Sequence, residues 1–324
     1  MTGLLAAPVI AGAIGLPHVL RLERAAPPAA IAIWLAALLL RALVSVTVVV
    51  LIVVWFPATE LFEHLTGWCW HAVLPFVVAH LHLNGHRLGD LSTLVPAVVL
   101  GLSLVWVVWG VLKAARAVRR LIRSGGLGPG PLGSLLVGGA DVILAVAGLW
   151  RPRVVVSTGA LTVLDDSELA AGMAHEKGHI ARSHRYLLLV GTVCGGLARF
   201  IPGTQQALNE LAFSLERDAD HYALSQRHDR LSLASAICKT ASSPASPALH
   251  ALGTGPRVTG RVRLLLSDEP SAETGKLRRH SPHLLAVAMT SLTLAALIAS
   301  PMVLIAQAET PGFSTGAAHP HCQS

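Results

Sequence analysis

The sequence predicts a mainly α-helical, polytopic membrane protein that carries a small α+β domain. Hydrophobic residues make up 53% of the 324 residues and charged residues only 13%, about half the charged share of a typical soluble chain. Lys and Arg gather beside long apolar runs, which is how cations orient a membrane protein. The net charge of +7 therefore indicates membrane topology and not nucleic acid as a partner.

Apolar stretches at four places are candidates for membrane spans, because about 20 residues cross the hydrocarbon core. They are Leu4 to Leu20, Ala30 to Pro57, Leu91 to Leu112 and Leu284 to Ala306. The first is short and competes with a signal peptide, but it lacks a basic start and a small-residue cleavage site. In the second, Arg41 is the one charge, and we expect its side chain to reach the cytoplasmic interface.

The cations favour one orientation, with both termini outside and the long central segment in the cytoplasm. The tail after residue 306 has no Lys or Arg. Basic residues instead lie between spans one and two (Arg21 and Arg24), directly after span three (Lys113, Arg116, Arg119, Arg120 and Arg123) and before span four (Lys276, Arg278 and Arg279). We therefore expect a membrane region at 1–112 with three spans, a cytoplasmic domain at 113–282, a final transmembrane helix at 283–306 and a short extracytoplasmic tail at 307–324.

The central domain should begin with a flexible linker, because Ser124 to Pro131 reads SGGLGPGP. Two apolar, β-branched runs follow, Asp141 to Ala147 and Val154 to Ser157, and a turn around Trp150 to Pro152 would join them as a strand pair. The apolar stretch from Leu187 to Ile201 is too short to span. It predicts a buried helix or a hairpin that dips into the membrane.

Residues 165–186 read as one helix, with Asp165 and Glu168 in a capping-box pattern. The helix contains His175-Glu176-Lys177-Gly178-His179, and the spacing of four puts both imidazoles on one face, where a tetrahedral Zn²⁺ accepts both. Glu176 can then act as a general base toward a water on the metal. Gly178 would leave room beside the metal.

A second helical pattern, residues 205–226, offers the remaining groups. Glu216 is the candidate third ligand, and Asp220, one turn later, can accept the free ring N–H of a ligating histidine. The alternative is that the charged residues of this helix form a solvated face: Glu216, Arg217, Asp218 and Asp220. The candidate donors to an oxyanion are His184, His221 and Tyr222, and the sequence does not choose among them.

Residues 153–225, with the HEKGH run and the later Glu216 and Asp220, resemble membrane metallopeptidases. One such family is the BlaR/MecR type of sensor-transducer, which inactivates a repressor; the other is the HtpX and CAAX-prenyl-protease type. The resemblance implies a zincin-like domain with His175, His179 and Glu216 as zinc ligands, Glu176 as base and Asp220 as a supporting carboxylate. Three spans before the motif and one after favour the BlaR/MecR type, in a short, sensor-less form without a penicillin-binding domain.

The sequence thus predicts a multi-pass membrane zinc metalloendopeptidase, with one Zn²⁺ per chain, acting on proteins at the cytoplasmic membrane face. Its expected role is regulatory proteolysis such as repressor inactivation, and the strand Val154 to Ser157 is expected to bind substrate as an added strand. One alternative is quality control of membrane proteins, as in the HtpX type. Another is a non-catalytic transducer stabilised by zinc, which would need a fourth protein ligand such as His184 or His221.

Overall fold

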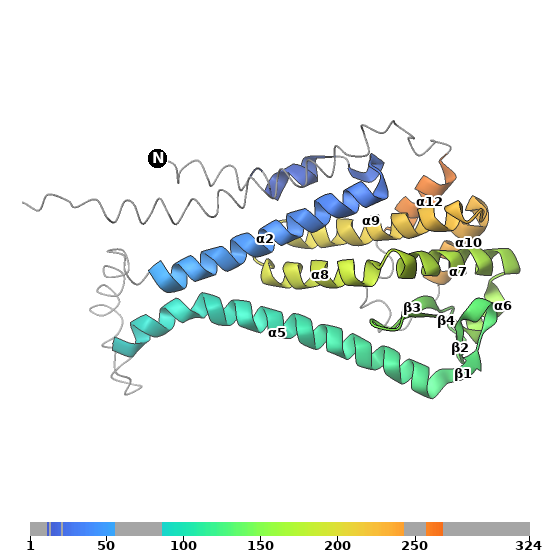
Figure 1. Ribbon diagram of the computed structural model, residues 1–324, viewed down its shortest axis with the longest axis horizontal. Coiled ribbons are helices and arrows are strands. Elements are labelled where there is room, and N and C mark those ends of the chain that lie inside the picture. Colours follow the sequence, from blue (N-terminus) through green and yellow to red (C-terminus); the bar gives the residue numbers. More distant parts are fainter. Residues whose placement is uncertain (1–11, 13, 21, 56–85, 243–256, 268–324) are drawn as a thin grey trace, which may run out of the picture.

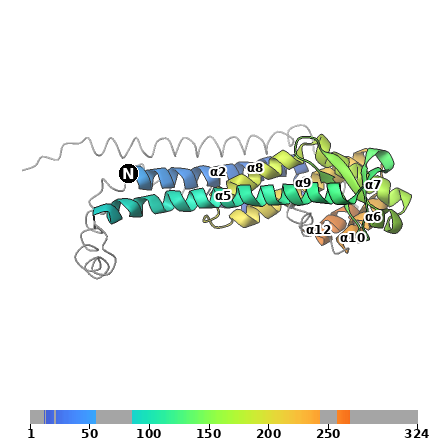
Figure 2. The same cartoon turned by 90° about the horizontal axis from the view of Figure 1, so that it is seen from below.

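The computed structural model describes residues 12, 14–20, 22–55, 86–242 and 257–267, and these residues are mostly helical. Two long helices, α2 (Pro27–Trp55) and α5 (His86–Gly125), run along the molecule. Helices α8 (His184–Leu197) and α9 (Thr204–Ser225) pack against α2, and α8 also packs against α5. A small sheet and the shorter helices lie at one end of the molecule, as Figures 1 and 2 show.

Helices α2 and α5 each contain a segment that is long and apolar enough to cross a membrane. These segments are Pro27–Val53 and Val95–Ala117, and they overlap the predicted second and third spans. Large apolar side chains of α5, such as Leu102, Val105 and Trp106, are exposed. The predicted last span and tail lie outside the described residues, as does most of the first stretch.

Arg41, in the middle of α2, does not reach an interface as predicted, because its side chain is fully buried. Its Nη2 donates to the Ile14 carbonyl at 2.9 Å and lies 2.7 Å from Nε2 of His18, while Nη1 donates to the Ala37 carbonyl at 3.2 Å. A helical segment that precedes α2 supplies two of these partners. The guanidinium therefore fastens this segment to α2 instead of extending toward water.

The core between α2, α8 and α9 is apolar and tightly closed. Trp34 and Leu38 of α2 pack with Leu211 and Leu215 of α9, and all four are nearly inaccessible to solvent. Gly191 on α8 permits this contact, because a Cβ there would lie 2.5 Å from Leu211 Cδ2. The helix pair α8–α9 is thus packed against the apolar helix α2, and α9 extends from there to the sheet end.

The sheet has four strands in the order β1-β2-β4-β3. Strands β3 (Leu144–Ala147) and β4 (Arg153–Ser157) are antiparallel, which confirms the predicted strand pair. Strand β2 (Leu135–Val137) pairs in parallel with β4. The predicted linker is wrong, since Gly126–Pro129 forms β1, which follows α5 directly and pairs antiparallel with β2 around a short 3-10 helix, η3 (Pro131–Gly133).

After β4 come α6 (Thr158–Val163) and α7 (Asp166–Ala181). The capping box is confirmed: Asp165 accepts from the Glu168 N–H, and Glu168 accepts from the Asp165 N–H. The prediction of one helix to residue 186 is wrong, because Ser183 adopts a left-handed conformation (φ 57°) and α8 starts at His184. Two further helices, α10 (Arg230–Ala241) and α12 (Val258–Leu266), pack against each other.

Candidate metal centre

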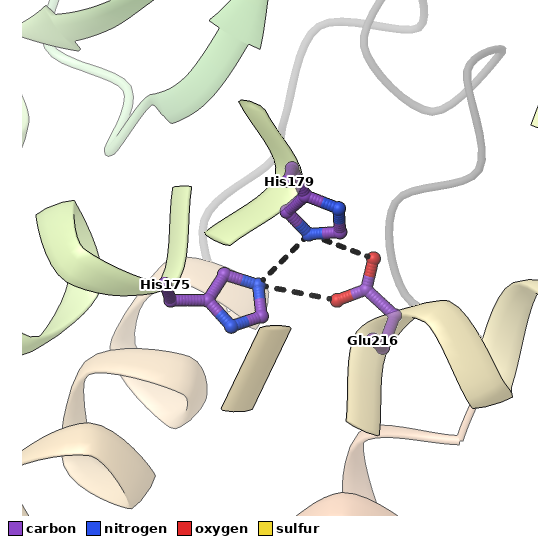
Figure 3. Close-up of side chains that lie close together, drawn as sticks. All are labelled: His175, His179 and Glu216. Atoms are coloured by element: carbon purple, nitrogen blue, oxygen red, sulfur yellow. Dashed lines mark hydrogen bonds and ion pairs between the residues drawn. The ribbon is translucent and has the colours of Figure 1, made fainter. Parts of the chain in front are cut away.

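Helices α7 and α9 bring three predicted ligands together. Nε2 of His175 lies 3.2 Å from Nε2 of His179 and 3.4 Å from Oε2 of Glu216. Nε2 of His179 lies 3.5 Å from Oε1 of Glu216. Figure 3 shows the two rings and the carboxylate pointing toward one another. Ligand atoms of all three residues lie within 4.8 Å of one another, so one metal ion can contact all of them.

The close crossing of α7 and α9 depends on Gly178. A Cβ at this position would lie 3.0 Å from Tyr222 Cβ and 3.1 Å from Tyr222 Cδ1. The expectation that Gly178 leaves room beside the metal is therefore wrong: the glycine faces α9, and it leaves room for the neighbouring helix. Gly178 therefore allows α7, which carries the two histidines, to lie close to α9, which carries Glu216.

Asp220 lies where the sequence predicted, behind a ligand histidine. Its Oδ1 is 2.9 Å from Nδ1 of His175, so a proton on Nδ1 leaves Nε2 of that ring free to bind a metal. Arg261 of α12, which the sequence did not indicate, holds both acids. It donates to Asp220 from Nε at 2.9 Å and from Nη2 at 2.6 Å, and to Glu216 Oε2 from Nη1 at 2.6 Å.

The charged-face alternative for α9 is wrong, because Asp218 and Asp220 are buried and Glu216 has a side chain only 15% exposed. Arg217 points elsewhere: its guanidinium donates to the carbonyls of Leu22 and Ala25, at η1 (Leu22–Arg24) and just before α2. The charges of α9 therefore face inward, toward other parts of the fold.

Glu176, the predicted base, lies beside strand β3. The backbone N–H of Val146 donates to its carboxylate, yet burial dominates and raises the pKa of Glu176 to about 7. A carboxyl group with this pKa can take up a proton and release it again near neutrality.

Strand β3 is at the edge of the sheet, whereas β4 is paired on both sides. The prediction that Val154 to Ser157 receives an added strand is therefore wrong.

The two ligand histidines differ in protonation. Burial lowers the pKa of His175, but bonds to Asp220 and Glu216 outweigh burial and raise the pKa to about 10. For His179 burial prevails and lowers the pKa to about 3. Burial also acts on Glu216, but Arg261 and the histidines hold the pKa of its carboxyl well below its usual range. The metal-free site therefore holds a proton on His175, where a metal would supply the positive charge.

The buried charges fit a divalent cation. Three carboxylates, those of Glu176, Glu216 and Asp220, face one guanidinium, that of Arg261. When all are ionised the excess is two negative charges, which a divalent ion cancels. Two imidazoles and a carboxylate are a donor set that zinc prefers, so the residues fit the predicted Zn²⁺.

The three candidate oxyanion donors lie at different places. His184 is behind His179, with both ring nitrogens already engaged at 3.0 Å by His179 Nδ1 and Asp218 Oδ2. Tyr222 packs against Gly178, and His221 is exposed. In this arrangement His184 is therefore not a free donor. The structure also places three residues at the site that no sequence motif indicated: Arg261, Asp218 and Val146.

Comparison with known protein families matches residues 113–213 to peptidase family M48. The matched segment contains β1 to β4, α6, α7 and α8 and the first half of α9, so it includes His175, Glu176 and His179 and ends three residues before Glu216. No curated protein and no solved structure matches. The family match indicates a metallopeptidase, a hydrolase that acts on proteins, and peptidases of this family are typically zinc-dependent.

Proposed function

We propose that this chain is a multi-pass membrane zinc metalloendopeptidase that cleaves proteins at the cytoplasmic membrane face. The observation that carries the proposal is that ligand atoms of His175, His179 and Glu216 lie within 4.8 Å of one another. Glu176 follows His175 directly on α7. The family match over residues 113–213 supports the same chemistry. The match does not distinguish a BlaR/MecR-type role from an HtpX-type role.

The chain's own residues would do the following. His175, His179 and Glu216 hold the ion, which supplies Lewis acidity toward water and a peptide carbonyl when it is bound. Glu176 takes a proton from the water that attacks the carbonyl carbon and returns it to the leaving amine nitrogen. Asp220 fixes the tautomer of His175, and Arg261 keeps Asp220 and Glu216 ionised.

A catalytic role is favoured over a structural zinc site by the number of ligands. Structural zinc sites are usually closed by four protein ligands, whereas catalytic sites have three and an open position. Among the described residues the group that could hold the ion has three members. His184 stands behind His179 and His221 is exposed, so neither supports the non-catalytic transducer.

Strand β3 is the element that we propose binds the substrate backbone. Ile143 accepts a hydrogen bond from the Ser157 N–H, so alternation along an antiparallel pair directs the backbone groups of Leu144 and Val146 away from β4. Val146 accordingly donates to Glu176. A peptide added at the β3 edge would lie beside Glu176. No peptide can be added to β4 in this way, because β2 and β3 pair with it on both sides.

The membrane setting rests on α2, α5 and the charge pattern. The basic residues that follow the apolar part of α5 are exposed and lie toward the sheet end: Lys113, Arg116, Arg119, Arg120 and Arg123. Cations on this side favour a cytoplasmic location of the sheet and the metal centre. The domain at 113–282 would then act on cytoplasmic or membrane-bound proteins, with a transcriptional repressor as the proposed regulatory substrate.

The test is Glu176→Gln in the full-length protein purified in detergent. We expect the variant to bind one zinc ion as tightly as the wild type and to cleave no protein substrate. Asp166→Asn is a matched control, because Asp166 is an exposed acid on the same helix. Proteolysis that survives in metal-loaded Glu176→Gln protein would refute the mechanism.

Comparative proteomics of native membranes with wild-type or Glu176→Gln protein tests the substrate class. Selective loss of one regulatory protein in the wild type supports regulatory proteolysis. Broad loss of misfolded membrane proteins would instead support quality control.

A further inference from the structure

A row of three hydrogen-bonded side chains, two of them buried, extends from the metal centre to α9. Nδ1 of His179 lies 3.0 Å from Nδ1 of His184, and Nε2 of His184 lies 3.0 Å from Oδ2 of Asp218. The side chains of His184 and Asp218 are 3% and 4% exposed. These contacts connect the second ligand histidine to a carboxylate that is not itself among the candidate ligands.

The break between α7 and α8 creates this row. In one continuous helix, residue 184 would point to a different face from residue 179, because five residues exceed one turn by 1.4 residues. Ser183 instead adopts φ 57°, a conformation uncommon for residues other than glycine. The polypeptide backbone changes direction at Ser183, so that the side chain of His184, the first residue of α8, contacts the ring of His179.

The requirement for a metal fixes the direction of each hydrogen bond. His179 presents Nε2 to His175 and Glu216, so this nitrogen must carry the lone pair when an ion binds. The ring proton then lies on Nδ1, and Nδ1–H donates a hydrogen bond to Nδ1 of His184. The proton of His184 consequently lies on Nε2, and Nε2–H donates a hydrogen bond to Asp218. Only this order of protons satisfies all three residues.

The two ligand histidines are therefore supported in different ways. His175 is next to a carboxylate directly, through Asp220, which Arg261 holds in turn. His179 is next to the imidazole of His184, and the carboxylate of Asp218 is one residue further away. Asp218 has a weaker second neighbour, Arg182, with Nε at 4.0 Å and a side chain 46% exposed. His184 is thus the main buried partner of Asp218 among the described residues.

We propose that His184 and Asp218 are positioning residues that orient His179 and select its metal-binding tautomer. This inference rests on the proposed function, since it assigns His179 to a zinc ion. His184 acts by accepting a hydrogen bond from Nδ1–H of His179, and Asp218 acts by holding His184 in the tautomer that accepts this bond. Neither residue touches the reacting atoms.

Variants of His184 separate its two contacts. In His184→Asn, the amide oxygen can replace Nδ1 as an acceptor for His179, but the side chain is too short to reach Asp218. In His184→Gln, the longer side chain can donate to Asp218 without presenting an acceptor to His179. His184→Ala removes both contacts, and Asp218→Asn removes the charge that fixes the tautomer. His228→Asn is the control, a histidine in the loop before α10.

The measurement is zinc affinity by chelator competition in the full-length protein in detergent, with the absorption bands of the Co²⁺-substituted protein as a second readout. We expect His184→Ala and His184→Gln to lose about 10- to 100-fold in affinity, the range for removal of an outer partner of a metal ligand. His184→Asn should retain a higher zinc affinity than either of these variants. The affinity of Asp218→Asn should lie between that of His184→Asn and those of His184→Ala and His184→Gln. His228→Asn should match the wild type in affinity and in the Co²⁺ bands.

The outcomes are distinguishable. Equal affinity in the wild type and in all the His184 and Asp218 variants overturns the positioning role and leaves the proposed function intact. Higher affinity in His184→Gln than in His184→Asn also overturns it, because the contact with Asp218 alone would then matter. If thermal unfolding shows that the Ala variant does not fold, the Asn and Gln variants decide by their order. Absence of zinc binding by the wild type would overturn the proposed function itself.

Discussion

Arg261 donates two hydrogen bonds to Asp220, from Nε to Oδ2 at 2.9 Å and from Nη2 to Oδ1 at 2.6 Å. The remaining Nη1 donates to Glu216 at 2.6 Å. The Arg261 side chain is 6% exposed, so the three charges interact where water screens them little. A residue from α12 thereby holds both acids of α9 that serve the metal centre, and the centre depends on the docking of α12.

Replacing Arg261 should make folding depend on metal. In Arg261→Met, two buried carboxylates lose their cation, and removing one partner of a buried ion pair costs about 3–5 kcal/mol. A bound zinc ion compensates part of this loss with its own charge. We expect a large drop in the thermal midpoint of the metal-free variant and a much smaller drop with saturating zinc.

Arg263→Met is the matched control, since Arg263 lies two residues away on the same helix and is exposed. It should melt like the wild type with and without zinc. Equal destabilisation of the Arg261 variant in both states would show that Arg261 serves packing and not charge balance.

Zinc binding should release a proton near neutral pH. The pKa of His175 in the metal-free protein is about 10, so its ring is protonated at pH 7 to 8 and must lose about one proton to bind a metal. Calorimetric titrations with zinc in buffers of different ionisation enthalpy measure this number. Binding enthalpies that do not vary with the buffer would contradict a protonated His175.

The same pKa predicts how the metal-free protein responds to alkali. The folded pKa of His175 is raised above the ordinary value of 6.5, so the folded state binds this proton more tightly than the unfolded state does. The resulting stabilisation is complete below pH 6.5 and is lost as the pH rises toward 10. Thermal midpoints of metal-free protein should therefore fall over this range, and those of His175→Phe should fall less.

Local patterns predicted the parts of the site that one helix can specify. The spacing of His175 and His179 and the Asp165–Glu168 capping box depend on neighbours in sequence, and the structure has both in the predicted places. Glu216 and Asp220 needed only the assumption that a second helix folds back. The strand pair β3–β4 was predictable because a short turn joins two β-branched runs.

The remainder depended on contacts between distant segments. Gly126–Pro129 has the composition of a linker, yet it pairs with β2. The position of β4 inside the sheet depends on β2, which the strand pattern did not reveal. Arg261 contacts Glu216 across 45 positions, and nothing in its neighbours distinguishes it from Arg257 or Arg263. The turn at Ser183 lies in a run that fits a continuous helix, so the pattern placed no boundary there.

Gly178→Ala should weaken the metal centre without touching a ligand. The new methyl group would lie 3.0 Å from Tyr222 Cβ, closer than carbon atoms normally approach, and overpacking of this kind costs about 1–3 kcal/mol. The backbone of α7 must move away from α9, which separates the histidines from Glu216. We expect lower zinc affinity by chelator competition. Gly101→Ala is the control, because a Cβ at Gly101 meets no atom within 4 Å.

Glu168 should contribute to stability through its charge, because it connects α7 with α10. Its carboxylate accepts from Ser235 Oγ at 2.5 Å and Lys239 Nζ at 2.6 Å as well as from the Asp165 N–H. Burial raises the pKa of Glu168, but these donors outweigh burial and lower the pKa below its ordinary value of 4.5. Stability from this group is therefore present above pH 4.5 and is lost as the pH falls through the lower folded value.

Glu168→Gln keeps the shape of the side chain and removes the charge, so we expect a loss of about 1–2 kcal/mol at pH 7, discounted because Lys239 is partly exposed. Chemical unfolding in detergent at pH 7 and at pH values below 4.5 measures the difference between variant and wild type. The difference should shrink in acid, because the wild-type carboxylate then becomes protonated and loses its advantage over the amide. A difference that stays constant through this range would show that the amide fails for steric reasons and that the charge of Glu168 contributes nothing.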